Sequence, residues 1–242
     1  MKPVLICLLC CTGIYHSGMA QQTSFGAMQG PPMAMPATIF LTDIQGKRST
    51  EEWNRHEIKG TPFFIPNWAK AVITLADNRR FNNISIRLNC VNNSIHYLNA
   101  QQEEMVAPDG VIKELLLLDS QATFTKEYIL VSGFPAIDKH TLNTFYERQI
   151  NGTVQLLMYT KKRLMELRTM GSAAPEKEYM GVESFYLYKD GQIRSWEKGK
   201  DFLLDLLSDK KEAVEGYIKQ NNLKCKSIED CRAVVSYYNT LQ

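Results

Sequence analysis

The feature that most constrains the fold of this chain is a strict alternation of apolar and polar residues between Asn83 and Cys90. The apolar positions are Ile84, Ile86, Leu88 and Cys90, and the polar positions between them are Ser85, Arg87 and Asn89. A period of two is typical of a β-strand that buries one face. Asp77-Asn78 and Asn92-Asn93 flank this pattern, and both pairs tolerate the left-handed backbone of tight turns. The pattern therefore predicts an antiparallel sheet built from hairpins.

Further turn signals recur along the chain. Pro108-Asp109-Gly110 is a strong turn signal, and Leu115–Leu118 after it reads as a strand buried on both faces. Asn151-Gly152 and Asp190-Gly191 predict two more hairpins, because these dipeptides favour the turn whose twist matches paired strands. The residues from 169 to 175 read as a loop between two long strands.

After Gly199 the apolar residues repeat at helical spacing. Phe202, Leu203, Leu206 and Leu207 form a first stripe. Asp209 followed by Glu212 matches a capping box, and Ser227 is a second candidate N-cap. Two or three C-terminal helices are expected, and their narrow apolar stripes require packing against one another or against the sheet.

The sequence thus predicts a mainly β protein: an antiparallel meander of about eleven strands that forms a curved sheet, a sandwich or a partly open barrel. We expect a signal peptide over 1–20, a flexible lead-in over 21–37, the β domain over 38–198 and a helical cap over 199–242. In the lead-in, Gln, Gly, Met and Pro predominate, so it can form little core of its own.

The N-terminus predicts export. Lys2 precedes the apolar run Val4–Ile14, and Gly18-Met19-Ala20 is a small-x-small cleavage site, so cleavage after Ala20 is expected. Lipidation at Leu8-Leu9-Cys10-Cys11 is the disfavoured alternative, since no small residue precedes a modifiable cysteine. After cleavage no run reaches the ~18 to 20 apolar residues of a membrane helix. A periplasmic, cell-surface or secreted location is therefore predicted.

Composition argues against a nucleic-acid partner and leaves open whether the mature chain forms a disulfide. With 28 basic and 26 acidic residues, the chain carries no concentrated basic footprint for nucleic acid. Its densest basic cluster, Lys161-Lys162-Arg163, reads as a solvated strand end.

Three cysteines remain after cleavage. Cys90 is predicted to be a buried thiol, whereas Cys225 and Cys231 lie in a compartment where a disulfide between them could persist.

Several segments together resemble a family of secreted proteins from Bacteroidota that has no established activity. The resemblance covers most of the mature chain and lies in Gly60-Thr61-Pro62-Phe63-Phe64, Trp68, Arg87-Leu88-Asn89, Gly133-Phe134-Pro135, Asn143-Thr144-Phe145-Tyr146, Tyr186-Leu187-Tyr188-Lys189-Asp190-Gly191, Leu207-Ser208-Asp209-Lys210-Lys211, Tyr217-Ile218 and Tyr237-Tyr238-Asn239. It implies an exported or envelope location and supplies no catalytic residues. A Cys225–Cys231 disulfide would be a local feature of this chain.

No recognised catalytic, metal or cofactor motif occurs in the sequence. His56, His96 and His140 are isolated from one another, and His96 beside Tyr97 reads as a packed strand residue. Glu103 and Glu104 would point to opposite faces of a strand. The aromatic residues that could face a ligand are Trp68, Tyr186, Tyr188 and Trp196, although strands also favour aromatics for packing.

Three functional hypotheses remain open. The first is a non-enzymatic envelope component that contacts another macromolecule, for which the exposed edges of a meander favour strand addition. The second is a carrier that holds a small apolar or aromatic ligand between the sheet and the C-terminal helices. The third is a hydrolase whose site is assembled from distant residues. No catalytic residue, metal ligand or cofactor-binding residue is assigned, and no cofactor is expected.

Overall fold

The computed structural model of the chain describes residues 44–50, 58–119, 125–168 and 175–241. The predicted signal peptide with its cleavage point after Ala20, the lead-in and the segment 169–174 of the predicted loop lie outside these residues.

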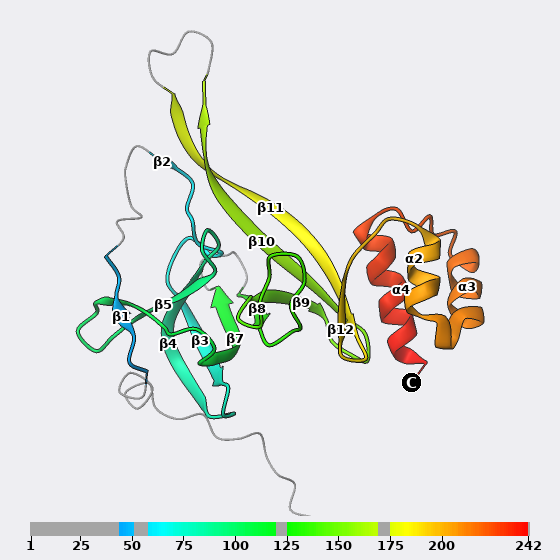
Figure 1. Cartoon of the computed structure of the whole chain (residues 1–242), viewed down its shortest axis with the longest axis horizontal. Coiled ribbons are helices and arrows are strands. Elements are labelled where there is room, and N and C mark those ends of the chain that lie inside the picture. Colours follow the sequence, from blue (N-terminus) through cyan, green and yellow to red (C-terminus); the bar gives the residue numbers. More distant parts are fainter. Residues whose placement is uncertain (1–43, 51–57, 120–124, 169–174, 242) are drawn as a thin grey trace, which may run out of the picture. The chain divides into compact units, whose positions relative to one another are not determined.

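The described residues form one 12-stranded, largely antiparallel open sheet followed by three C-terminal helices, as predicted (Figure 1). The strand order is β1-β6-β5-β4-β3-β7-β8-β9-β10-β11-β12, and β2 pairs with β11 in parallel. The strands are β1 (Lys47–Arg48), β2 (Ile58–Lys59), β3 (Ala69–Leu75), β4 (Arg80–Asn89), β5 (Ser94–Leu98), β6 (Glu104–Val106), β7 (Ile112–Asp119), β8 (Lys126–Val131), β9 (Tyr146–Ile150), β10 (Gln155–Leu167), β11 (Glu176–Lys189) and β12 (Gln192–Ser195).

The turns fall largely where the sequence predicts them. Asn78, Asn93 and Gly110 adopt the left-handed backbone at the predicted turns between strands. Asp190 and Gly191 also adopt it, and they form a two-residue turn because Lys189 pairs with Gln192. The connection at Asn151-Gly152 is wider than a two-residue turn, since β9 ends at Ile150 and β10 begins at Gln155.

The alternating strand β4 is buried on both faces along its second half. Ile84, Ile86 and Leu88 are buried on one face, as predicted. Arg87 on the polar face is also buried, because its guanidinium lies over the rings of Phe63 and Trp68 at 3.6 and 4.1 Å. The segment from Pro62 to Phe64 pairs with the end of β4, where Phe64 N donates to the Leu88 carbonyl and Cys90 N donates to the Pro62 carbonyl. This pairing brings the ring of Phe63 onto the face that carries Arg87.

The C-terminal helices are α2 (Lys200–Leu206), α3 (Lys211–Gln220) and α4 (Ile228–Thr240), with a short 3-10 turn η1 (Ser208–Lys210) before α3. Ser227 caps α4 by accepting a hydrogen bond from Asp230 N, as predicted. The capping box at Asp209 is wrong: Asp209 lies within η1, and its carboxylate accepts hydrogen bonds from Lys189 Nζ and Tyr238 Oη. Among the described residues, none of the helices combines the length and apolarity needed to span a bilayer.

Neighbouring residues of β10 belong to different cores. Leu156 and its strand partner Leu187 pack against the helices, where they share a core with Leu203 of α2 and Val235 of α4. Leu157, one position on, faces the other side of the sheet, where it packs with Phe134 and Tyr186. A third core lies between β3, β4, β5 and β7, with Ile73, Phe81, Ile86, Leu115 and Leu117 at its centre. The pair β10–β11 is therefore covered on both faces at its base.

Candidate functional site

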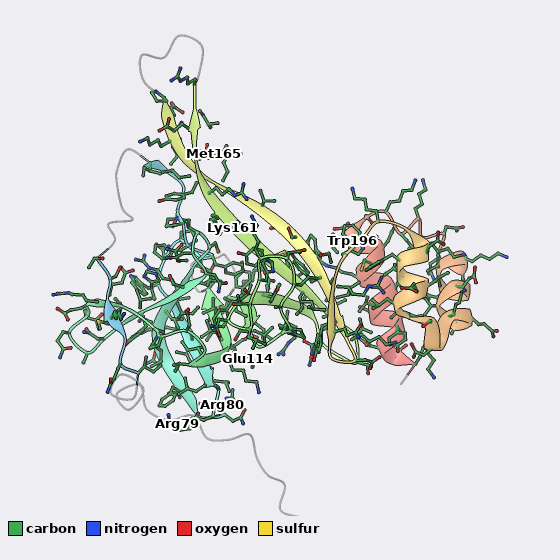
Figure 2. All side chains as sticks on the ribbon, in the orientation of Figure 1. Arg79, Arg80, Glu114, Lys161, Met165 and Trp196 are labelled. Carbon is green, nitrogen blue, oxygen red and sulfur yellow. The ribbon has the colours of Figure 1, made fainter. Side chains whose placement is uncertain are left out.

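The four aromatic residues predicted to face a ligand lie in three different places. Tyr186 and Tyr188 share one face of β11, where Tyr188 packs edge-on against Phe134 at 5.0 Å. Trp196, labelled in Figure 2, lies with the helical core, edge-on to Phe185 at 6.3 Å. Trp68 contacts the guanidinium of Arg87. Of the four, Tyr186 lines a hollow; the structure does not bring the four together.

Cys225 and Cys231 carry free thiols and are buried at 1% and 0% exposure. Burial raises the pKa of both thiols, and that of Cys231 reaches about 12. The disulfide between them is not formed in this structure and stays a prediction for the exported protein. Cys90 is a buried thiol, as predicted.

The outer edge of β11 is open over five residues. Near its start, Lys177 and Glu178 pair with β2; near its end, Tyr186–Lys189 pair with β12. Among the described residues, Met180–Ser184 between these stretches have a strand partner on the β10 side alone. The side chains of Met180 and Val182 are 47% and 63% exposed. Between β2 and β12, these five residues therefore form an unpaired strand edge, here called the open run.

The pairing fixes which backbone groups face the gap. In an antiparallel pair, successive residues direct their N–H and C=O groups to opposite sides. Trp196 N donates to the carbonyl of Phe185, which therefore points towards the β12 side. The backbone N–H and C=O groups of Glu183 and Gly181, two and four residues before Phe185, point to the same side. Their backbone groups thus face the open edge, whereas those of Val182 and Ser184 pair with β10.

A hollow of about 800 Å³, here called the mixed-charge groove, opens on the helix side of β11. Gly181 and Glu183 line it, and so does Arg232 from α4. A chain of hydrogen bonds crosses its floor: Arg232 donates to Gln149, and Gln149 Nε2 donates to Glu147 Oε1 at 2.5 Å. The groove therefore joins the sheet to the last helix through polar side chains.

Burial is the main cause of the pKa shifts of two titratable groups of the groove. Burial raises the pKa of Glu147, and the positive charge of Lys126 opposes this effect. Burial lowers the pKa of Lys162, whose Nζ donates to the carbonyls of Thr61 and Phe63 at 3.0 and 2.5 Å. Lys161 and Lys162 are half-buried, and the cluster Lys161-Lys162-Arg163 lies in the middle of β10. The interpretation of this cluster as a solvated strand end is therefore wrong.

On the opposite face of the same strands lies a hollow of about 360 Å³, here called the cationic hollow. Val182, Ser184 and Tyr186 of β11 line it beside Tyr159, Lys161 and Arg163 of β10 and Lys139 and His140 of the loop before β9. Figure 2 labels Lys161 on β10. The described lining residues include three cationic side chains and no carboxylate.

Hydrogen bonds orient the aromatic wall of the cationic hollow. His140 Nδ1 and Tyr146 Oη are 2.7 Å apart, and the ring of His140 lies 4.1 Å from that of Tyr159. Burial lowers the pKa of His140, so the imidazole is neutral at neutral pH. Lys161 Nζ donates to the Val91 carbonyl at 2.7 Å and retains two further protons for a ligand.

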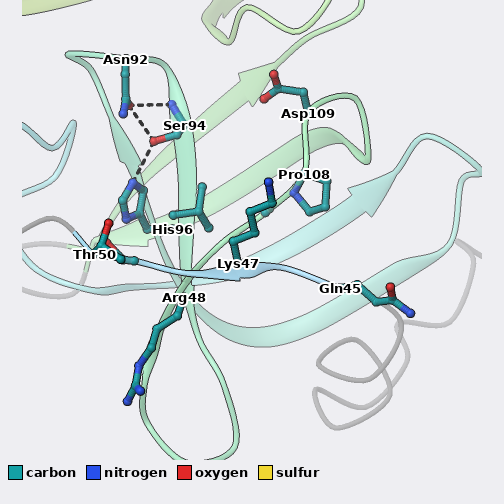
Figure 3. Close-up of a pocket in the computed structure, with 12 residues that line it drawn as sticks. Gln45, Lys47, Arg48, Thr50, Asn92, Ser94, His96, Pro108 and Asp109 are labelled. Atoms are coloured by element: carbon teal, nitrogen blue, oxygen red, sulfur yellow. Dashed lines mark hydrogen bonds between the residues drawn. The ribbon is translucent and has the colours of Figure 1, made fainter.

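A third hollow, of about 490 Å³, lies beside β1, β5 and β6 (Figure 3). Here Ser94 Oγ is 2.8 Å from His96 Nε2, and His96 Nδ1 is 2.5 Å from Glu104 Oε1. Arg87 donates to the other oxygen of Glu104 at 2.7 Å. The order Ser–His–Glu resembles the hydrogen-bonded triad of serine hydrolases.

The protons in this network do not suit a nucleophilic serine. Asn92 Oδ1 accepts from both the backbone N–H and the hydroxyl of Ser94, at 3.1 and 2.6 Å, so the side-chain oxygen of Asn92 must face Ser94. The single hydroxyl proton of Ser94 is then used, so the proton between Oγ and His96 Nε2 must come from the imidazole. Because Nδ1 also faces a carboxylate oxygen of Glu104, this arrangement requires the imidazolium, with a proton on both ring nitrogens. A nucleophile needs the reverse direction, with the serine donating to the histidine. His96 is also only 1% exposed.

Sequence reasoning missed both the Ser94–His96–Glu104 network and the cationic hollow. The expectation that Glu103 and Glu104 diverge holds, since Glu103 pairs with Arg48 while Glu104 meets His96. The signal for the hollow was present in β10, where a period of two separates Lys161 and Arg163 from Lys162. Among the described residues, no group of three or more His, Cys, Asp or Glu side chains could hold a metal ion.

Comparison with known proteins adds no relative: no protein-family model, no curated protein and no solved structure matches the chain.

Proposed function

We propose that this chain is an exported, non-enzymatic binding protein that captures an extended segment of a partner protein as an added strand at the open edge of β11. The observation that carries the proposal is the run Met180–Ser184, which β2 and β12 leave uncovered among the described residues. Outward-facing N–H and C=O groups on such an edge can pair with a new strand, and this pairing supplies affinity. The export expected from the signal sequence, with cleavage after Ala20, favours a partner that is itself periplasmic, on the cell surface or secreted.

The open run lacks the devices that usually protect a sheet edge. Natural edges are blunted by lysines, prolines, bulges or inward-pointing charges. Here the exposed side chains Met180 and Val182 are apolar, and Gly181 between them has no side chain. Glu183 is the single charged residue of the run. An unprotected edge beside two hollows favours a docking surface.

The alternatives draw less support from the described residues. A carrier of an apolar ligand needs space between sheet and helices, where Leu187, Leu203 and Val235 are fully buried against one another. Both hollows beside β11 are lined by charged side chains instead. A hydrolase built on Ser94 conflicts with the donation of its hydroxyl proton to Asn92.

The proposal can be tested with displayed peptides. Random ten-residue peptides on phage would be selected on the mature chain, and a selected peptide would be synthesised. We expect its binding to slow the hydrogen exchange of the backbone amides of Gly181 and Glu183. The amide of Ser184 pairs with β10 already, so its protection should change little. Selected peptides that leave the amides of Gly181 and Glu183 unprotected would overturn the proposal.

A matched pair of variants separates the backbone from the side chain. Glu183→Pro removes an outward-facing N–H while keeping the ladder to β10, and proline is tolerated at such edge positions. Glu183→Ala removes the side chain but keeps the N–H. We expect the proline variant to lose binding at least about tenfold, since a ladder hydrogen bond and steric access are lost together. The alanine variant should bind, and circular dichroism would confirm that both variants are folded. Equal binding by both variants would contradict strand addition.

A further inference from the structure

The two hollows lie on opposite faces of the open run. Val182 and Ser184 line the cationic hollow, while Gly181 and Glu183 line the mixed-charge groove. A strand added beside β11 would follow the same pleat, so its alternate side chains would point to these two faces in turn. The structure around the edge can therefore read the side chains of the captured segment as well as its backbone.

We infer that the captured segment carries acidic side chains at alternate positions, i and i+2, which enter the cationic hollow. This inference rests on the proposed function, because strand addition sets the alternation. Across β11 the register pairs Val182 with Lys161 and Met180 with Arg163. A segment residue opposite Val182 thus faces Lys161, and one opposite Met180 faces Arg163. Two acids that are two positions apart would meet both cations.

The distances between strands permit these contacts. The added strand would lie two strand spacings from β10, roughly 10 Å. On this face the β11 side chains that lie between the two strands are Val182, opposite Lys161, and Met180, opposite Arg163. Val182 is small, and Met180 is unbranched, flexible and 47% exposed. Long lysine and arginine side chains on β10 can lean across them towards a glutamate carboxylate. Lys139, from the loop before β9, adds a third positive charge to the same hollow.

The mixed-charge groove does not impose one sign of charge. It holds the cations Lys126, Lys162 and Arg232 together with Glu147 and Glu183. Charge selection should therefore be confined to the side chains that face the cationic hollow.

Two occupants from this chain itself do not fit the charge requirement. The lead-in over 21–37 contains no acidic residue. A second copy paired through the same edge would present Val182 and Ser184 to the cationic hollow, because Glu183 points to the other face. A separate partner with acidic alternation is the occupant that the charges favour.

The test uses three synthetic ten-residue peptides with blocked ends. Threonine alternates with glutamate in the first, with glutamine in the second and with lysine in the third. Fluorescence anisotropy would give their affinities for the mature chain. We expect the glutamate peptide to bind about fivefold or more tightly than the glutamine peptide, and the lysine peptide to bind weakest, since partly exposed ion pairs contribute modestly. Added salt should reduce the advantage of glutamate.

Matched variants test whether the preference for glutamate arises in the cationic hollow. Arg163→Gln removes a cation from the cationic hollow, and Lys126→Gln removes one from the groove on the opposite face. The first should lower the affinity for the glutamate peptide towards that for the glutamine peptide, and the second should leave the preference for glutamate intact. The double variant Lys161→Gln with Arg163→Gln should remove the preference.

The remaining outcomes distinguish the inference from the proposed function. If glutamate and glutamine peptides bind equally and Glu183→Pro abolishes both, strand capture stands and acidic recognition is overturned. If the glutamate peptide binds equally well to Glu183→Pro, charge attraction acts without strand addition, and both proposals fail. Equal losses in Arg163→Gln and Lys126→Gln would overturn the placement of the acids in the cationic hollow.

Discussion

The side-chain amide of Asn239 in α4 forms two hydrogen bonds with the backbone of Val154, 85 positions earlier in the chain. Its Oδ1 accepts from Val154 N at 3.0 Å, and its Nδ2 donates to Val154 O at 2.9 Å. Val154 is fully buried, so this amide supplies backbone partners that water cannot reach. A Cβ on Gly152 would lie 2.4 Å from Asn239 Nδ2, which explains a glycine at this approach. The last helix is thus fastened to the start of β10.

Asn239→Ala should lower the free energy of unfolding by about 1–3 kcal/mol, because it leaves a buried N–H and C=O without partners. Urea denaturation followed by circular dichroism would measure the loss. Asn221→Ala is the matched control, since the Asn221 amide is exposed and donates within its own helix to Tyr217 O. We expect the control to change stability by less than about 0.5 kcal/mol. Equal losses in both variants would show that the Asn239–Val154 contact contributes nothing specific.

Glu147→Gln should raise the free energy of unfolding at neutral pH. Burial raises the pKa of Glu147 in the folded state, so the folded chain binds the proton more tightly than the unfolded chain. Stability contributed by this group is therefore present below the ordinary pKa of 4.5 and is lost as pH rises through the higher, folded-state value. Glutamine keeps an oxygen that can accept from Gln149 and removes the buried charge.

Urea titrations of wild type and Glu147→Gln between acidic and neutral pH would test this sign. The gain should be largest at neutral pH and should vanish below the ordinary pKa, where the carboxyl is protonated in both states. Glu127→Gln on β8 is a suitable control, because Glu127 is exposed and its side chain forms no hydrogen bond with another described residue. A variant less stable than wild type at neutral pH would mean that the charges of Lys126 and Arg232 outweigh burial.

Local pattern predicted the strands and the helical end, but contacts between distant segments decided the rest. The alternation from Ile84 to Leu88 correctly predicted one buried face of β4. It could not show that Arg87 is buried as well, because Phe63 and Trp68, which cover its guanidinium, come from a different part of the chain. Asp209 has a good capping sequence, yet Lys189 and Tyr238 take its carboxylate.

The candidate site has the same mixed origin. The alternation of Lys161, Lys162 and Arg163 follows from the period of a strand, so their separation between two faces is predictable once β10 is recognised. The open edge is not predictable in this way. It exists because β2 covers β11 at Lys177 and Glu178, while β12 covers it from Tyr186 onward. No local sequence pattern indicates that β11 lacks an outer strand partner between the residues paired with β2 and those paired with β12.

Ser94 should not react as a nucleophile. Its hydroxyl proton is donated to Asn92, so His96 is not placed to accept it. Treatment of the folded protein with a fluorophosphonate probe should therefore leave its intact mass unchanged, with a known serine hydrolase as the positive control. An adduct mapped to Ser94, and absent in Ser94→Ala, would contradict this proton assignment and favour the hydrolase hypothesis.

The buried cysteines should resist alkylation in the folded protein. Burial raises the pKa of Cys90 and Cys231 to about 12, and the reactive species is the thiolate. At pH 8 only about one thiol in ten thousand would be ionised at such a pKa, so iodoacetamide should label both slowly and label the urea-unfolded chain at once.

Mass spectrometry of the chain after unfolding without reductant would count the labels. In the mature chain, which keeps Cys90, Cys225 and Cys231, three labels would mean that all three thiols are free. A single label on Cys90, with both thiol hydrogens missing from Cys225 and Cys231, would show that the predicted disulfide forms on export. Rapid labelling of Cys231 in the folded chain would instead mean that the helical core opens readily.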